Sequence, residues 1–437
     1  METTEMEVLE QNQDIAEISE GVNKEISEAS EDKSNVVNTE VIEDINQLEN
    51  QEITEETHET SDLPIGNLSF QIEKEVLLNG LKIVERATAQ KGLQPVLANI
   101  LLEAINKNTL KLYATDFDLS MITSVEAQVS VLGKITLPAR KLIDIVSRLN
   151  DGIINFELDN TTMVIKSGKS KFEILGISAN EFPSIEILSE EDNEVEIDLK
   201  PFIIGIKEAG FAAASYESNN NLLSGVVCDI NKNVLEIAST DGNRLARARK
   251  IITNKDDKII KLIVPAKILQ EFLKISYFID EDTIKIYTKN NKIMIQSDNI
   301  TMISSIMNGQ YPQYNQLIPQ SFPKEAKVNV QKIVSALERV STMVDEKKNS
   351  VKFNFSNNSL SLMADTPEAG NSKDEIDILY SGDDILIAFN YRYLLECFKN
   401  IDAENMIICM NTNLSATVIK PDNEEDFIYL IMPVQIR

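Results

Sequence analysis

One pattern of about 125 residues is written three times along this chain. Its clearest marker is a helix-like segment that follows an apolar strand, and this occurs at 137–150, 263–276 and 387–400. A strand ending in an acidic turn lies upstream of each, at Asp116, Asp241 and Asp365, with offsets of 125 and 124 residues. A period this long exceeds that of short-repeat solenoids, so it indicates three tandem copies of a whole domain.

Each copy opens with a strand that runs into another helix-like segment, from residues 70, 197 and 328, so six helices are expected. Five of the six carry two cations seven positions apart, which is nearly two turns, and each pair therefore shares one helical face. The pairs are Lys141/Arg148, Lys200/Lys207, Lys267/Lys274, Lys332/Arg339 and Arg392/Lys399, and the sixth helix carries Lys82 and Arg86. Apolar residues occupy mostly the opposite side.

Two interpretations of these cations remain open. Each helix could be an ordinary solvated face with local ion pairs, because Asp144, Glu271 and Glu396 stand three or four positions from a cation. For any single helix this is the better interpretation. Recurrence in three copies favours a shared cationic surface.

The first 66 residues differ from the rest of the chain. They hold 20 acidic and 2 basic residues, a net charge of −18, no aromatic residue and the only histidine, His58. With so little apolar content for its charge, this segment is predicted to be an acidic, disordered extension. Signal and transit peptides need basic, acid-poor sequence, so it matches neither. The remaining 371 residues carry −10.

Between the helices the chain reads as short alternating strands broken by turns. Strands with one helix, followed by strands with a second helix, predict an α+β class in which two helices pack on antiparallel sheet. The expected domains are 67–190, 191–320 and 321–437, after the extension at 1–66.

Catalytic and metal chemistry have little support in the sequence. Nucleophilic catalysis by a Ser-His or Cys-His pair needs a histidine, and 67–437 contain none. Gly168-Lys169-Ser170 ends like a phosphate-binding loop, but Met163 stands where that loop needs glycine. The aspartates at the repeated turns are expected to cap backbone amides. The three cysteines, Cys228, Cys397 and Cys409, lie in apolar segments, as core thiols in a reducing cytoplasm would. We therefore predict a non-enzyme without cofactor or metal.

Several motifs resemble one family in order and at matching distances. Thr240-Asp241-Gly242-Asn243-Arg244-Leu245 resembles the Thr-Asp-Gly-x-Arg-Leu signature of bacterial sliding clamps, the beta subunits of DNA polymerase III. The ending Tyr429-Leu430-Ile431-Met432-Pro433-Val434 is similar to the Met-Pro ending of that family. Further matches are LPARK at 137–141, SGKSKF at 167–172, EFPSIE at 181–186 and YPQYNQLIP at 311–319. The resemblance covers about 68–437 and omits the acidic extension.

The resemblance implies a non-catalytic processivity factor of bacterial DNA replication. Two three-domain chains would join head to tail into a closed homodimeric ring, a permitted symmetric assembly. Twelve helices would line the hole, where their cations attract phosphates of duplex DNA without reading bases. The ring would tether the polymerase III catalytic subunit by effective concentration. A separate clamp loader would open it, and it would work in the cytoplasm, on the nucleoid.

The resemblance also implies site residues. Partner proteins would insert a short peptide with apolar end residues into an apolar pocket between the second and third domains. By position that pocket includes Leu223, Thr240, Gly242, Arg244, Leu245, Pro312, Leu317, Tyr393, Leu414, Ala416, Leu430, Ile431, Met432, Pro433 and Val434. The residues expected to face DNA are Lys82, Arg86, Lys91, Arg140, Lys141, Arg148, Lys200, Lys207, Lys267, Lys274, Lys332, Arg339, Arg392 and Lys399. Phe172 would meet Thr342 and Met343 of a second copy at the dimer interface.

Other functions compete with this one. The chain could be a specialised clamp paralogue, kept for repair or for resistance to an inhibitor. It could instead be an acidic protein scaffold that does not encircle DNA, which the net −10 of 67–437 favours. The −18 of residues 1–66 also suggests an extension that competes with DNA for the cations, although a solvated tail without a function is the better hypothesis.

Overall fold

Six α-helices and twenty-six strands make up the part of the chain that the computed structural model describes. The described residues are 67–89, 94–189, 193–215, 221–254, 257–345, 349–366, 370–423 and 426–435. The helices are α2 (Lys74–Val84), α3 (Ala139–Arg148), α4 (Leu199–Ala209), α5 (Ala266–Ile275), α6 (Val330–Ser341) and α7 (Tyr391–Asn400). The predicted extension at 1–66 lies outside the described residues.

The strands form four antiparallel sheets. The first has the order β5 (Gln128–Val131), β1 (Ser69–Glu73), β7 (Ile153–Asp159), β8 (Thr162–Ser167), β9 (Ser170–Leu175). The second has the order β10 (Asn193–Asp198), β15 (Thr283–Lys289), β16 (Lys292–Gln296), β17 (Ile300–Ser305), β4 (Leu119–Glu126), β3 (Thr109–Thr115), β2 (Asn99–Ala104), β6 (Gly133–Pro138).

The other two sheets belong to the second half of the chain. The third sheet has the order β14 (Ile259–Pro265), β11 (Gly225–Asn231), β12 (Val234–Thr240), β13 (Arg244–Ile251), β26 (Phe427–Ile431), β25 (Thr417–Pro421), β24 (Asn405–Met410), β18 (Lys324–Asn329), β22 (Leu379–Ser381). The fourth has the order β21 (Gly370–Asp377), β20 (Ser359–Thr366), β19 (Ser350–Ser356), β23 (Ile385–Asn390).

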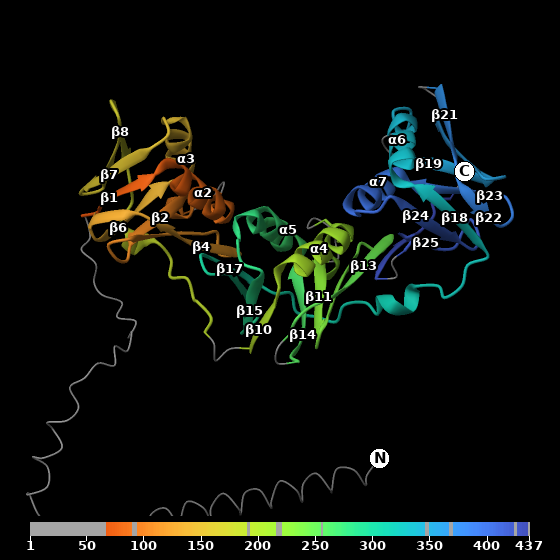
Figure 1. Cartoon of the computed structure of the whole chain (residues 1–437), viewed down its shortest axis with the longest axis horizontal. Helices are drawn as coiled ribbons and strands as arrows, with labels where there is room; N and C mark the ends of the chain where they lie inside the picture. The colour runs from red at the N-terminus through yellow and green to blue at the C-terminus, as the bar shows by residue number, and fades with distance from the viewer. Residues whose placement is uncertain are drawn as a thin grey trace, which may run out of the picture. The chain divides into compact units, whose positions relative to one another are not determined.

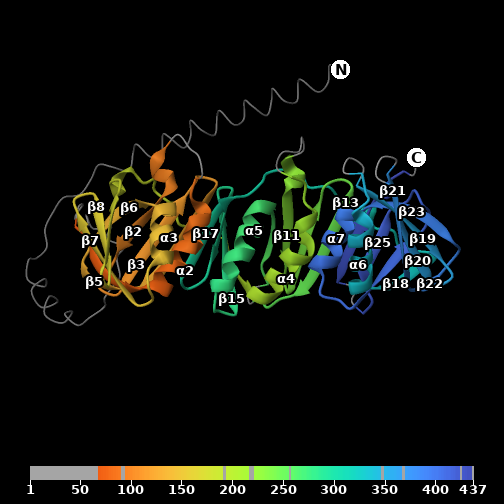
Figure 2. The same cartoon turned by 90° about the horizontal axis from the view of Figure 1, so that it is seen from above.

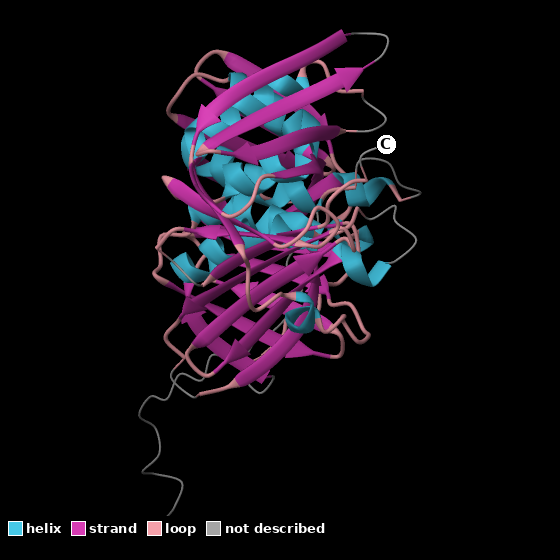
Figure 3. Ribbon diagram, turned by 90° about the vertical axis from the view of Figure 1, so that its right-hand side faces the viewer, coloured by secondary structure: helices cyan, strands magenta, loops and turns pink. Residues whose placement is uncertain are grey.

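The helices are amphipathic and cover one face of the sheets. In α5, Ile268, Leu269 and Phe272 are buried, whereas Lys267 and Lys274 are exposed. The helices contact each other in pairs, α2 with α3, α4 with α5, and α6 with α7, as Figures 1 and 2 show. Strands border the helices in the view of Figure 3. The predicted α+β class, with six helices on antiparallel sheet, is therefore confirmed.

Two of the sheets are shared between neighbouring copies of the repeat. Strand β4 of the first copy pairs with β17 of the second, with Ser120 opposite Ile303. Strand β13 of the second copy pairs with β26 of the third, with Leu245 opposite Leu430. We call these places junction 1–2 and junction 2–3. Continuous hydrogen-bonded sheet therefore joins the repeats, and the domain limits predicted from sequence stay predictions.

Apolar clusters lie on both faces of the shared sheets. The large helix-side cluster runs through all three copies. On the opposite face, the outer face, junction 1–2 carries a small cluster of Leu188, Tyr287, Met294 and Ile303. Junction 2–3 carries a separate cluster, whose buried members are Val227, Ala238, Leu245, Ile263, Tyr311, Tyr314, Cys409, Val418 and Leu430. Alternate residues of one strand point to opposite faces, which is why neighbours in β26 belong to different clusters.

The three cysteines and two of the turn aspartates occupy the places that the sequence predicted. The three cysteines are free and buried, as expected, and burial raises the pKa of all three thiols. Asp116 and Asp241 each accept two backbone N–H groups at their turns, so the capping prediction is confirmed there. In the described ranges no helix is long and apolar enough to cross a membrane.

A candidate partner pocket and a cationic helix face

The Thr240–Leu245 turn positions the candidate pocket. The Thr240 hydroxyl accepts the Gly242 N–H at 3.1 Å, and one Asp241 carboxylate oxygen accepts the N–H groups of Asn243 and Arg244 at 2.9 and 3.0 Å. Gly242 has φ +89, a conformation that side chains with a Cβ disfavour. The Met432 N–H donates to the Asn243 carbonyl at 2.9 Å, so the turn also holds the start of the carboxyl-terminal segment.

Behind this turn, the outer face of the third sheet carries an apolar floor. Leu245 and Leu430 face each other across β13 and β26 and are 1% and 5% exposed. Leu223 and Ala416, half-buried, pack against the same cluster. Leu317, Leu414 and Met432 are 59%, 68% and 42% exposed, and they stand one or two positions in sequence from Ile318, Ala416 and Leu430 of this cluster and its surroundings. Three large apolar side chains exposed to solvent beside a buried apolar floor are typical of a binding surface.

Two tyrosines hold the connecting segment over this face. The Tyr311 hydroxyl donates to the Gly225 carbonyl at 3.2 Å and accepts the Thr240 N–H at 3.0 Å. The Tyr314 hydroxyl donates to the Glu236 carboxylate at 2.5 Å. Burial raises the pKa of Tyr311 to about 12, so it stays protonated. Sequence reasoning missed both tyrosines, although they stand inside the YPQYNQLIP motif.

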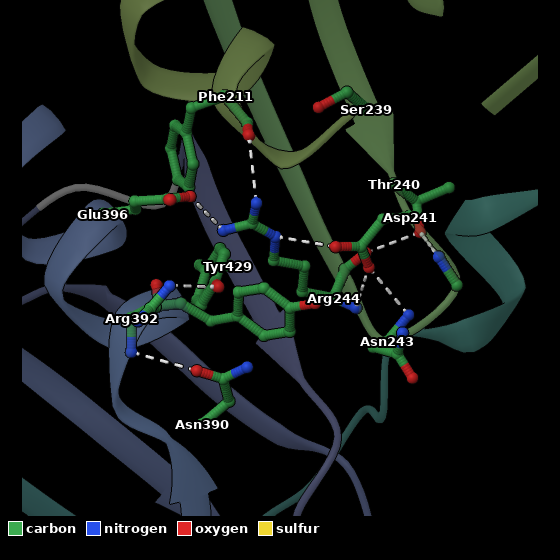
Figure 4. Close-up of polar contacts among 12 residues, drawn as sticks. Phe211, Ser239, Thr240, Asp241, Asn243, Arg244, Asn390, Arg392, Glu396 and Tyr429 are labelled. Atoms are coloured by element: carbon green, nitrogen blue, oxygen red, sulfur yellow. Dashed lines mark hydrogen bonds and ion pairs between the residues drawn. The ribbon is translucent and has the colours of Figure 1, made fainter. Parts of the chain in front are cut away.

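Arg244 points to the other side of the sheet, toward α7 and the short 3-10 turn Gly210–Ala212 that follows α4 (Figure 4). It is 7% exposed. Its guanidinium donates to Asp241 at 3.0 Å, to Glu396 of α7, and to the Phe211 carbonyl at 3.3 Å. The Tyr393 ring stacks on it, with 4.1 Å from Cζ to the ring centroid. Burial alone would lower the pKa of Arg244, but Tyr429, Glu396 and Asp241 outweigh burial and raise it.

The structure therefore divides the predicted pocket residues between two faces. Leu223, Leu245, Ala416 and Leu430 meet on the outer face. Leu317, Leu414, Met432 and Pro312 are exposed in segments that adjoin this cluster in sequence. Arg244 and Tyr393 instead line a helix-side cleft of about 550 Å³, together with Asn243, Lys267 and Gln270.

Apart from Gly242 of the turn, the remaining predicted pocket residues are buried or half-buried. Ile431 is fully buried in the helix-side core, and the Thr240 hydroxyl donates to the Arg244 carbonyl. Pro433 and Val434 are half-buried, and the Val434 N–H donates to the Ala388 carbonyl at 2.8 Å. Sequence reasoning missed Phe211 and Glu396 as partners of Arg244, because nothing in a linear motif indicates contacts between distant segments.

The candidate DNA-facing cations lie on helix surfaces. All are exposed except the half-buried Arg86, and Lys91 lies outside the described residues. Five are engaged by carboxylates: Arg86 by Glu271, Arg148 by Asp144, Lys274 by Glu271, Arg339 by Asp374 and Lys399 by Glu338. Seven have no ion-pair partner in the described part of the chain: Lys82, Arg140, Lys141, Lys200, Lys207, Lys267 and Lys332. Arg392 lies over the Tyr391 ring. The local ion pairs of the alternative interpretation thus exist, but they leave about half of the cations unpaired.

The predicted dimer-interface residues lie at two free sheet edges. Phe172, 38% exposed, is on β9, the edge of the first sheet. Thr342 and Met343 follow α6 beside β21, the edge of the fourth sheet, where the Met343 Cε lies 3.5 Å from the place a Cβ on Gly370 would take. They belong to different copies of the repeat.

Comparison with known proteins identifies the family. Domain models of the DNA polymerase III beta subunit match in order: the N-terminal domain at 68–186, the central domain at 196–313 and the C-terminal domain at 315–435. A beta sliding clamp of Synechococcus elongatus is 32% identical over 368 residues, which span 83% of this chain and 97% of that protein. A beta sliding clamp of Pseudomonas putida is 26% identical over 84% of this chain and all of its own length.

Solved structures agree with the sequence comparison. The beta subunit of Thermotoga maritima superposes with a TM-score of 0.78 at 25% identity, over 85% of this chain and all of that one. The beta subunit of Pseudomonas aeruginosa gives 0.77 at 27% identity, over 84% of this chain and all of that one. The chain belongs to the DNA polymerase III beta-subunit family, the non-catalytic sliding clamps that make the polymerase processive.

Proposed function

We propose that two copies of this chain close head to tail into a ring around duplex DNA, in the bacterial cytoplasm and on the nucleoid. The helix cations supply a sequence-independent attraction to phosphates, because seven of them are free of ion pairs in the described residues. The DNA-facing set is the one predicted from sequence, from Lys82 to Lys399. No base contact is needed, so the ring slides and stays on the duplex by topology.

Internal symmetry supports the ring closure. At junction 1–2, β17 pairs with β4, and at junction 2–3, β26 pairs with β13. By position in the repeat, β9 corresponds to β17 and β26, whereas β21 corresponds to β4 and β13. An unpaired sheet edge is a template for another strand. Pairing β9 of one copy with β21 of a second copy therefore repeats the joint that the chain already makes twice.

Both edges carry charges of both signs. Strand β9 has Lys171 and Glu173 on either side of Phe172, and β21 has Lys373, Asp374 and Glu375. The interface would bury Phe172 against Thr342 and Met343 of the second copy. Phe172→Glu combined with Met343→Glu should yield monomers in analytical ultracentrifugation, because two buried carboxylates would face apolar partners. Leu386→Glu, on the 40%-exposed residue of β23, is the control and should remain dimeric. A dimer that persists in the double variant would contradict this interface.

We further propose that the outer face of junction 2–3 receives short peptides from the polymerase III catalytic subunit, the clamp loader and other partners. One observation carries this: Leu317, Leu414 and Met432 are exposed and stand one or two positions in sequence from Ile318, Ala416 and Leu430, which belong to or pack against the buried apolar cluster. An aliphatic or aromatic side chain placed there would remove this apolar surface from water. Arg244 and Tyr393 line the separate helix-side cleft at the same junction, where a further part of a partner peptide would contact them.

A fluorescence-anisotropy titration with labelled Gln-Leu-Asp-Leu-Phe tests the pocket. We expect saturable binding to the full chain. Leu414→Glu should abolish it because it places a charge on this apolar surface. A chain ending at Met432 should abolish it because it lacks Pro433 and Val434 of the predicted pocket set. Leu379→Glu is the matched control, because Leu379 is 67% exposed against 68% for Leu414 and lies on the distant strand β22. Absence of binding to the full chain, or equal loss in the control, would contradict the pocket.

A second candidate function is an acidic scaffold that does not encircle DNA; the specialised clamp paralogue would remain a ring, kept for repair or for resistance to an inhibitor. The support for the scaffold is the net −10 of residues 67–437 and the five helix cations held in ion pairs. Retention on nicked circular DNA, followed by release after linearisation, distinguishes the two. A ring should be retained only on the circle, and its contacts should weaken steeply with salt. A scaffold should show neither behaviour.

A further inference from the structure

Arg247 occupies an unusual place on the outer face of junction 2–3. It stands two residues after Leu245 on β13, so both side chains point to the same face, and it is paired with Ile428 of β26. It is only 8% exposed. Side chains two apart on a strand are separated by about 7 Å. Arg247 is therefore the next position along the sheet from the apolar floor of the proposed pocket.

The charge of Arg247 lacks a direct counter-ion. Its Nη1 donates to the Asn315 Oδ1 at 3.1 Å, and its buried Nε has no hydrogen-bond partner in the described structure. No carboxylate of the described residues comes within 4.0 Å of its guanidinium. The nearby Glu236 is already engaged, with one oxygen bonded to Tyr314 at 2.5 Å and the other to Arg249 at 2.6 Å. A buried arginine in this state is costly unless something else supplies an acceptor.

An opening leads toward this guanidinium. A polar cleft of about 630 Å³ is lined by Asn315, Glu236, Arg249 and Asp426, among others. Asn315 is exposed and is the only described residue that both lines this cleft and bonds to Arg247. Asn315 therefore links the cleft to the buried N–H donors of Arg247. A carboxylate is the better acceptor, because charge-assisted hydrogen bonds to arginine are about twice as strong as neutral ones.

We propose that Arg247 is a specificity-determining residue that binds a carboxylate of the partner peptide, two residues away from the apolar side chain seated over Leu245 and Leu430. The inference rests on the proposed peptide pocket. An extended peptide spaces alternate side chains by about 7 Å, the same interval that separates Leu245 from Arg247. The carboxylate accepts from the vacant Nε and from Nη2, which lies on the same side of the guanidinium, while the Asn315 amide oxygen can stay on Nη1. Partners without an acid at that position bind the apolar floor alone.

The test compares two labelled peptides, Gln-Leu-Asp-Leu-Phe and Gln-Leu-Asn-Leu-Phe, by fluorescence anisotropy on the full chain. In both, residue three stands two positions before the phenylalanine. We expect the aspartate peptide to bind about tenfold more tightly than the asparagine peptide, the ratio that one charge-assisted hydrogen bond supplies. Arg247→Met should reduce the ratio to about one and leave the asparagine peptide within about twofold of its original affinity.

Two further variants separate recognition from structure. Arg249→Met is the matched control, because Arg249 lies on the same face of the same strand but is exposed and already bonded to Glu236. It should keep the tenfold ratio. Arg247→Lys keeps the charge but loses the planar fork, so an intermediate ratio is expected. A purely structural role would weaken both peptides equally.

The possible outcomes keep the two proposals apart. An unchanged ratio in Arg247→Met, with the asparagine peptide still bound, would overturn the role of Arg247 and leave the pocket intact. Failure of both peptides to bind the unaltered chain would overturn the pocket and this inference with it. Urea unfolding of Arg247→Met checks that the variant is folded, and a methionine of similar length in this buried place should be tolerated.

Discussion

The two internal junctions are built on the same plan but treat their outer faces differently. In each, a connecting segment crosses the shared sheet and contains an aromatic–proline step, Phe182-Pro183 or Tyr311-Pro312. Six residues after the aromatic residue, each segment has a leucine. Leu188 is 5% exposed and packs on Ile303, Tyr287 and Met294. Leu317 is 59% exposed. Junction 1–2 therefore fills its own outer face, and junction 2–3 leaves its face open.

The physical reason lies in two hydroxyl groups. Tyr311 and Tyr314 bond to the sheet backbone and to Glu236, and these bonds fix the connecting segment by polar contacts. The corresponding residues at junction 1–2 are Phe182 and Ile185, which have no hydroxyl. Ile185 instead packs against the small apolar cluster. Tyr311 and Tyr314 also pack into the apolar cluster of junction 2–3, so that segment is anchored by its two tyrosines while Leu317 stays exposed.

The ion pairs on the helix side also differ between the two junctions: the arginine at junction 2–3 is more deeply buried. The sixth residue of the later helix supplies a carboxylate at both, Glu271 in α5 and Glu396 in α7. Arg86 meets Glu271 at 3.0 Å with 29% of its side chain exposed, and Glu271 also binds Lys274. Arg244 meets Glu396 and Asp241 with 7% exposed. Junction 2–3 thus concentrates its polar contacts in one buried arginine.

The two junctions should differ most in how much stability is lost when these arginines are replaced. Arg244→Met should lower the free energy of unfolding by about 3 kcal/mol, because it leaves the buried Asp241 carboxylate without its cation. Arg86→Met should lower it by about 1 kcal/mol, since Glu271 keeps Lys274. Urea unfolding followed by circular dichroism measures both. Equal losses in the free energy of unfolding would show that the two arginines stabilise their junctions equally, which would contradict this prediction.

The two leucines give the next largest contrast. Leu188→Ala should destabilise by about 2–4 kcal/mol, as expected for a buried leucine. Leu317→Ala should change stability by less than about 0.5 kcal/mol, because its side chain already meets water. It should nevertheless weaken binding of the Gln-Leu-Asp-Leu-Phe peptide, which Leu188→Ala should leave unchanged. Thermal unfolding and fluorescence anisotropy measure both effects. A large loss of stability in Leu317→Ala, or weaker peptide binding in Leu188→Ala, would contradict the prediction.

Alanine at the two turn tips tests backbone strain. Gly242 has φ +89 and Phe117, at the equivalent turn, has φ +75. Gly242→Ala should destabilise by about 1 kcal/mol, because alanine disfavours this conformation and nothing lies within 4 Å to compensate. Phe117→Ala should be close to neutral, since both residues bear the same strain and the ring is 61% exposed. A large loss at Phe117 would instead indicate that its ring has a packing role.

The smallest effect concerns acid stability. Burial tends to raise the pKa of Glu236, but hydrogen bonds from Tyr314 and Arg249 outweigh burial and lower it. A carboxyl with a lowered native pKa stabilises the fold above its ordinary pKa of about 4.3 and loses that contribution as pH falls through the native pKa. Glu236→Gln should therefore be less stable than the unaltered chain at pH 7, and the gap should close in strong acid.

The control for this acid effect is at junction 1–2. Lys111 is the third residue of β3, as Glu236 is the third residue of β12. Between pH 7 and pH 2.5, the stability of Lys111→Gln should fall with pH in the same way as that of the unaltered chain. A gap for Glu236→Gln that persists unchanged in strong acid would rule out the linkage.

Several features of the fold followed from sequence because they depend on local pattern. The 125-residue period predicted three copies, and helical periodicity predicted six helices with exposed cations. Turn chemistry predicted the amide-capping roles of Asp116 and Asp241. The pocket set was less completely anticipated. Strand alternation sends Leu430 outward and Ile431 inward, and a motif read as a continuous string cannot separate them.

The sequence by itself determined the repeat, the helix faces and the family, since these are written in short-range periodicity and ordered motifs. Only the tertiary structure decided which junction stays open, because that depends on two tyrosine hydroxyls reaching groups 71 and 78 residues away in the chain. It also decided that Arg244 turns inward to Glu396, 152 residues distant, and that Arg247 is buried without a carboxylate. Contacts over such separations are set by how the sheets join, which local pattern does not encode.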